Sequence, residues 1–263
     1  ILGILWADLG PGYAIDVWLS RWVRLFIGSS ILSVIVASRV SQVVARWPNH
    51  QRLGQWLQMA SISVAALSLL CVLGIELFNQ SLGGALSTLE VLAVCGGLVF
   101  VGWSLLVMAM KPSRDVLALS DTGRQVYVYL AEVIILLLLG HLWLTRPDWF
   151  TIFQNSWPYV LFALAFVGAF VSEYLRRSGI KVLADPIHNT SFLLPAVPII
   201  GLILFRESMV GPAAEYQWYF LLAALVNVVM AFFRKSFLHA MLAALAGNGS
   251  LWSAFIGADF AFV

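Results

Sequence analysis

Long apolar runs recur along the whole of this chain and carry almost no charge. Of its 263 residues, 61% are hydrophobic and only 11% are charged. A soluble globular domain has roughly 45–50% apolar and about 25% charged residues. A helix needs roughly 20 mostly apolar residues to cross a bilayer. The runs reach this length, so the composition indicates that lipid, and not water, surrounds most of the chain.

Eight of these runs are predicted to span the membrane as helices, joined by short loops. This fold class is an all-α integral membrane protein, because isolated strands leave backbone groups without partners in lipid and the runs show no strand-like alternation. The predicted spans are residues 17–44, 56–78, 84–110, 125–144, 157–175, 191–206, 217–233 and 236–256. They leave no room for a soluble domain, so we expect one transmembrane domain over residues 1–263. The chain begins with Ile1 and ends on an apolar segment. We therefore expect this domain to be a fragment of a longer membrane protein.

The distribution of basic residues predicts the orientation. Cytoplasmic segments of membrane proteins carry an excess of lysine and arginine. Eleven of the 15 basic residues lie in the last turns of the first predicted span or after the first, third, fifth and seventh spans: Arg39, Arg46, Arg52, Lys111, Arg114, Arg124, Arg176, Arg177, Lys181, Arg234 and Lys235. We therefore expect these loops in the cytoplasm and both chain ends outside it, in a bacterial-type inner membrane or cell membrane.

Several function classes are disfavoured. The net charge of +2 is too small to indicate a nucleic-acid partner. The motifs of P-loop ATPases, serine hydrolases and zinc proteases are missing from the sequence, so no catalytic residue is proposed and the chain is expected not to be an enzyme. His141 and His239 are predicted near opposite membrane faces, which argues against a shared haem, and no cysteine–histidine cluster has zinc spacing. No cofactor and no metal are expected.

Acidic residues inside the spans are the first candidates for a functional site, because burying a charge in hydrocarbon is costly. Glu90 and Glu132 are predicted about two turns inside their helices and could form a proton or ion path. The leading interpretation is that they form hydrogen-bonded contacts between helices. Glu76 and Glu173 lie nearer helix ends, where we expect them to be paired or to reach the interface.

A second candidate site lies near the sixth predicted span. This span is short and contains Pro195 and Pro198, and a polar loop with Asp185 and His188 precedes it. Broken helices beside polar segments are where transporters often bind substrates. A re-entrant segment is the alternative to a crossing helix here.

Two functional hypotheses follow from these features. The leading one is a non-catalytic membrane-embedded subunit or scaffold that packs against other membrane protein subunits within the lipid bilayer. The alternative is a secondary transporter or ion-conducting protein that uses Glu90 and Glu132. A membrane enzyme acting on lipid is a third possibility, although no acid–base pair is predicted at one interface.

Overall fold

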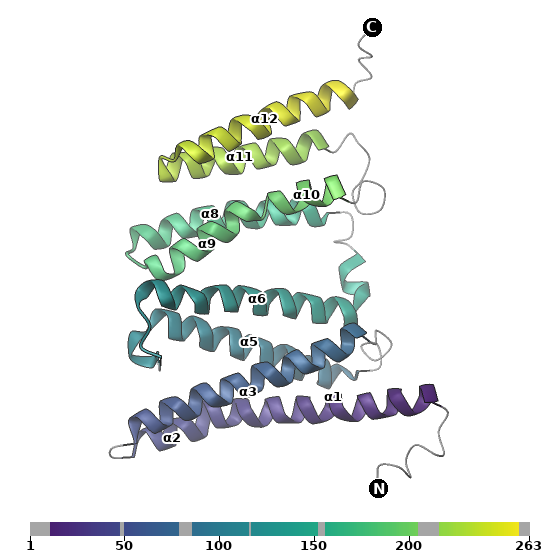
Figure 1. Ribbon diagram of the computed structural model, residues 1–263, viewed down its shortest axis with the longest axis vertical. Coiled ribbons are helices and arrows are strands. Elements are labelled where there is room, and N and C mark those ends of the chain that lie inside the picture. The colour runs from purple at the N-terminus through teal and green to yellow at the C-terminus, as the bar shows by residue number, and fades with distance from the viewer. Residues whose placement is uncertain are drawn as a thin grey trace. The chain divides into compact units, whose positions relative to one another are not determined.

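The computed structural model describes residues 11–47, 50–78, 86–115, 117–151, 156–204 and 216–257. Every regular element in these ranges is a helix, as expected from the sequence (Figure 1). The chain divides into two compact units, Ile1–Phe150 and Thr151–Val263, and each has its own set of packed helices. The single transmembrane domain expected over the whole chain stays a prediction.

The first unit is built from long helices that pack along one another. Its helices are α1 (Pro11–Ile35), α2 (Ser41–Ala45), α3 (Gln51–Phe78), α5 (Thr88–Met110) and α6 (Asp121–Thr145), with a π-helical turn η1 (Val36–Val40) joining α1 to α2 and two 3₁₀ turns, η2 (Pro112–Arg114) and η3 (Pro147–Phe150). α3 contacts α1, α5 and α6, and α5 also contacts α1 and α6. α3 and α5 therefore form the centre of this unit.

The second unit contains two pairs of neighbouring helices (Figure 1). Its helices are α8 (Trp157–Arg177), α9 (Lys181–Leu193), α10 (Ala196–Leu204), α11 (Tyr216–Arg234) and α12 (Phe237–Gly257). α8 packs on α9 and α11 packs on α12, while contacts of α8 and α10 with α11 join the two pairs.

Six helical stretches of the described residues are long and apolar enough to cross a membrane, which makes the chain a multi-pass membrane protein. They are Leu19–Ala45, Gln51–Phe78, Thr88–Met110, Asp121–Thr145, Trp157–Arg177 and Tyr216–Arg234. These correspond to six of the expected spans, and the count of about eight is not confirmed. α12 has 21 residues and contains the polar sequence Gly247-Asn248-Gly249-Ser250, and it is not one of the six.

The expected loop and span between residues 184 and 206 are wrong in detail. The polar segment is helical and belongs to α9, and the expected span 191–206 is divided between α9 and α10 by a turn at Leu194 and Pro195. Asp185 forms an ion pair with Arg234, and the His188 ring packs on His239. Such tertiary contacts outweigh the weak helix propensity of these residues.

Small residues allow the helices to approach closely, which is how helices associate in lipid. A Cβ atom on Gly168 of α8 would lie 2.0 Å from the hydroxyl oxygen of Ser191 on α9. A Cβ atom on Gly54 of α3 would lie 2.7 Å from the Ser41 carbonyl oxygen at the start of α2. The neighbouring backbone therefore requires glycine at position 54, whereas at Gly168 the Ser191 side chain of α9 occupies the space that a Cβ atom would need.

Candidate functional site

Glu90 closes the start of α5. Its carboxylate accepts hydrogen bonds from the backbone N–H and the hydroxyl of Ser87, both at 2.8 Å, while its own N–H donates to the Ser87 hydroxyl. Its second oxygen accepts from Arg24 Nε of α1 at 3.0 Å. Since α5 begins at Thr88, Glu90 lies in the first turn and not two turns inside. Both carboxylate oxygens are engaged in capping α5 and joining it to α1.

Glu132 lies in the middle of α6 and is half-buried. It follows Ala131, which is buried against the rest of the unit. His141 lies nine residues further along α6, which is about two and a half helical turns. The two side chains therefore leave the helix on opposite sides, and the structure does not bring Glu132 to the histidine.

A fully buried pair of ionisable side chains joins α3 to α6. His141 Nδ1 lies 2.8 Å from Glu76 Oε2, and both side chains are 0% exposed. Glu76 is near the end of α3 and His141 near the end of α6, while Thr145 donates its hydroxyl to the His141 carbonyl oxygen at 2.7 Å. The end of α6 is thereby fixed next to α3.

Each member of this pair keeps one polar atom without a partner. Glu76 Oε1 and His141 Nε2 are both buried and have no hydrogen-bond partner. Buried polar atoms are nearly always satisfied, so such atoms indicate a missing water, ion or ligand, or a catalytic role. An imidazole held through Nδ1 by a carboxylate, with Nε2 free, can accept or release a proton at the second nitrogen. The arrangement is suited to proton exchange.

The sequence contains one signal for this pair, which is the depth of the two residues in their predicted spans. Glu76 and His141 were each predicted near the same membrane face, at the ends of the second and fourth spans. Equal depth alone does not identify neighbours, because it does not say which spans are in contact. The contact between α3 and α6 supplies that information.

The opposite end of the first unit contains polar groups with a structural role. Asp115 accepts hydrogen bonds from the N–H groups of Leu117 and Leu119 and from the Tyr127 hydroxyl, at 3.1, 2.7 and 2.8 Å. The buried Arg124 donates to the Ala109 carbonyl at 2.8 Å. These bonds hold the connection between α5 and α6 against the helices.

A polar cavity of about 170 Å³ lies along the C-terminal half of α5. Its polar lining consists of Ser38, Gln42, Gln58, Ser104 and Arg114. Neither Glu76 nor His141 lines this cavity, so the cavity does not reach the histidine–glutamate pair. The interior of the unit also contains buried apolar side chains of α3 and α5: Leu69 and Val72, which lie along α3 between Gln58 and Glu76, and Leu98 and Val101.

In the second unit, the structure places Asp185 and His188 beside the turn between α11 and α12. Asp185 Oδ1 lies 3.4 Å from Arg234 Nη2, and the His188 and His239 ring centroids are 5.3 Å apart. α9 is not one of the six candidate spans.

Burial lowers the pKa of His188 to about 4, and the positive charge of Arg234 acts in the same direction. His188 is therefore neutral at pH 7.

Pro195 and Pro198 lie away from these two polar residues along the chain. Pro195 is in the turn that separates α9 from α10, and Pro198 is near the start of α10; both are buried. They interrupt the helix, as the sequence suggested, but do not share a site with Asp185 and His188. Among the described residues, no group of three or more histidine, cysteine, aspartate or glutamate side chains is placed to hold a metal ion.

Comparison with protein-family models, with curated proteins and with solved structures finds no match for this chain.

Proposed function

We propose that this chain is a proton-translocating membrane protein in which Glu76 and His141 bind and release the proton. The observation that carries the proposal is the fully buried 2.8 Å pair with a free atom on each member. A buried ionisable residue in a membrane span is costly and is by default a functional hypothesis. The proposed function is of the transporter class. Glu76 and His141 take the proton-carrying role that the sequence suggested for Glu90 and Glu132.

Charge balance supports one exchangeable proton in this pair. A carboxylate beside a neutral imidazole has a net charge of −1, and one added proton makes the pair neutral, whichever member carries it. Burying a net charge costs several kcal/mol, which is why the proposal gives this pair one exchangeable proton. Release of the proton therefore requires water or another cation to reach Glu76 Oε1 or His141 Nε2.

The surroundings support access from one membrane face at a time. The pair lies near the ends of α3 and α6, at the end of the unit where α5 begins. The polar cavity lies along the C-terminal half of α5, and the buried apolar residues Leu69 and Val72 lie along α3 between Gln58 of the cavity and Glu76 of the pair. We infer that a proton crosses this stretch only after a rearrangement of the helices, which favours a transporter over an open channel.

Proton flux into vesicles tests the proposal. The purified full chain is reconstituted with a pH-sensitive dye inside, and a potassium diffusion potential drives protons inward. We expect faster acidification than in protein-free vesicles, loss of the difference in Glu76→Gln, and nearly normal flux in Glu132→Gln. Wild-type flux equal to that of empty vesicles, or normal flux in a folded Glu76→Gln variant, would contradict the proposal.

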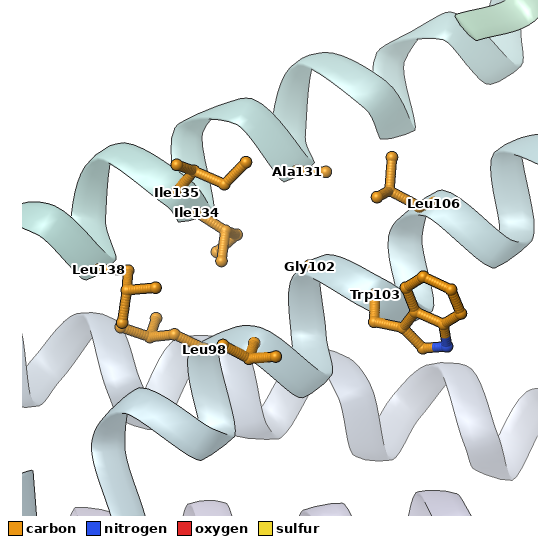
Figure 2. Close-up of a pocket in the computed structure, with 9 residues that line it drawn as sticks. Leu98, Gly102, Trp103, Leu106, Ala131, Ile134, Ile135 and Leu138 are labelled. Carbon is orange, nitrogen blue, oxygen red and sulfur yellow. The ribbon is translucent and has the colours of Figure 1, made fainter. Parts of the chain in front are cut away.

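A second function, a membrane-embedded subunit, is favoured by a groove between α5 and α6 (Figure 2). The groove is about 200 Å³ in volume, and its lining is entirely apolar. Gly102 and Ala131 face it from the two helices and leave room for a side chain, and Trp103, 62% exposed, lies at its edge. Tryptophan prefers the membrane interface, whereas Trp103 is well inside α5. A helix of another subunit could insert a side chain here.

Blocking the groove tests this second function. Gly102→Leu fills the space next to Ile134, since a Cβ atom on Gly102 would already lie 3.4 Å from Ile134 Cγ2. The subunit function predicts that a partner in fixed stoichiometry is lost from the mildly solubilised complex. Gly140→Leu, at a glycine with open space around it, serves as the matched control. Retention of the partner in Gly102→Leu would argue against this groove as the interface.

A further inference from the structure

The second unit contains a pocket between its two helix pairs. The pocket has a volume of about 290 Å³ and is lined by residues of α9, α10, α11 and α12 together with Pro195. Its walls are apolar side chains such as Phe192, Ile199, Phe220 and Leu242. This volume is close to the lower end of small-molecule sites, roughly 300–1,000 Å³.

One polar side chain, Asn227 of α11, lines this apolar pocket. Asn227 is 8% exposed, and its Nδ2 donates a hydrogen bond to the Ala223 carbonyl oxygen at 2.9 Å. Because a carbonyl oxygen can only accept, this bond fixes which end of the amide is nitrogen. Oδ1 is the other end of the amide, and it is buried without a hydrogen-bond partner.

The shape of the pocket depends on two backbone features. Gly249 of α12 carries no side chain, and a Cβ atom there would lie 3.0 Å from Phe220 Cδ1. Phe220 can therefore lie directly against α12 and form one wall. On the other side, the turn at Pro195 separates α9 from α10, so that Phe192 and Ile199 reach the pocket from two different helices.

From these features we infer that the second unit binds an apolar molecule that carries a hydroxyl group. An unpartnered buried amide oxygen accepts a hydrogen bond and cannot donate one, so the ligand must supply an O–H or an uncharged N–H donor. A charged amine is disfavoured by the apolar walls. A membrane-soluble alcohol satisfies both conditions, with its hydroxyl donating to Asn227 Oδ1 and its chain filling the space between Phe192 and Leu242. This site is independent of the proposed proton pair, which lies in the other unit.

Photolabelling with matched ligands tests the inference on the purified full chain. The probe is 1-decanol with a diazirine on its chain, and the competitors are 1-decanol and 1-methoxydecane, which has the same chain and no donor. We expect labelled peptides from α9, α11 and α12, and about tenfold stronger competition by the alcohol than by the ether, the ratio that one buried hydrogen bond supplies. In Asn227→Leu the two competitors should become equal.

Two further variants separate loss of the site from loss of the fold. Ala246→Leu fills the pocket without changing Asn227 and should abolish labelling of these helices, while Ala244→Leu, exposed on the same helix and outside the pocket lining, should leave it unchanged. Equal competition by alcohol and ether in the wild type would show that chains fill the pocket without recognition by Asn227. That result, or undiminished labelling in a folded Ala246→Leu variant, would overturn the inference.

Discussion

His141 Nδ1 and Glu76 Oε2 lie 2.8 Å apart between α6 and α3, with neither side chain exposed. This polar contact therefore joins two apolar membrane helices at a place where water has no access from the surface. Removing one partner leaves the other buried without compensation, whereas removing both removes both buried ionisable groups.

The effects of substituting Glu76 and His141 on the free energy of unfolding are expected not to be additive. Glu76→Leu or His141→Leu alone should lower the free energy of unfolding by about 3–5 kcal/mol, because each leaves a buried polar group unpaired. The double variant should recover most of that loss. The measurement is a detergent-denaturation titration of the four proteins. Additive losses in the double variant would show that the two side chains do not interact.

Two glycines of α3 offer a matched test of helix packing. Gly54→Ala should destabilise the first unit by about 1–3 kcal/mol, since the new Cβ atom would lie 2.7 Å from the Ser41 carbonyl oxygen and 2.6 Å from Ala45 Cβ. Gly74 has open space around it, so Gly74→Ala should stabilise the helix by up to about 1 kcal/mol. Thermal unfolding in one detergent compares them. Equal effects of the two substitutions would contradict the close packing of α2 on α3.

Acidification should destabilise the second unit through His188. Its pKa is lowered from 6.5 to about 4 in the folded protein, mainly by burial. The unfolded chain therefore binds the proton more readily, so the stabilisation is complete above about pH 6.5 and is lost as the pH falls toward 4. His239 contributes in the same direction, because burial lowers its pKa as well.

The measurement for His188 is the melting temperature of the wild type at pH 7.5 and pH 5. The fall between the two should be smaller in His188→Phe, which keeps a ring against His239 and has no proton to bind. His50→Gln, at an exposed position of the first unit, provides the control. An unchanged pH dependence in His188→Phe would show that His188 is not responsible.

The orientation expected from the basic residues can be tested by labelling single cysteines. Lys181 is exposed at the start of α9 and is expected in the cytoplasm, whereas Asp148 is exposed in η3 and is expected on the other side. In a chain without Cys71 and Cys95, a membrane-impermeant thiol reagent should label Asp148→Cys in intact cells and Lys181→Cys only after permeabilisation. The reverse pattern would invert the topology.

The long apolar helices were predictable from sequence because hydrophobic length is a local property. The helix α9 was not, because Asp185, His188 and Ser191 are weak helix formers whose contacts with other helices decide the outcome. Glu76 and His141 were each visible as polar residues near helix ends. Their pairing depends on which helices are neighbours, and apolar periodicity carries no information on that choice in a bundle surrounded by lipid.

The central claim is that Glu76 and His141 together exchange one proton in the folded protein. Infrared difference spectroscopy during a pH titration of the wild type and Glu76→Gln tests it most directly. In the wild type we expect a carboxyl C=O band or an imidazolium band that disappears as the pH rises. The same band should be missing from Glu76→Gln. The His141→Leu variant assigns the imidazole signal. A wild-type spectrum that shows no Glu76-dependent change across the titration would contradict the account.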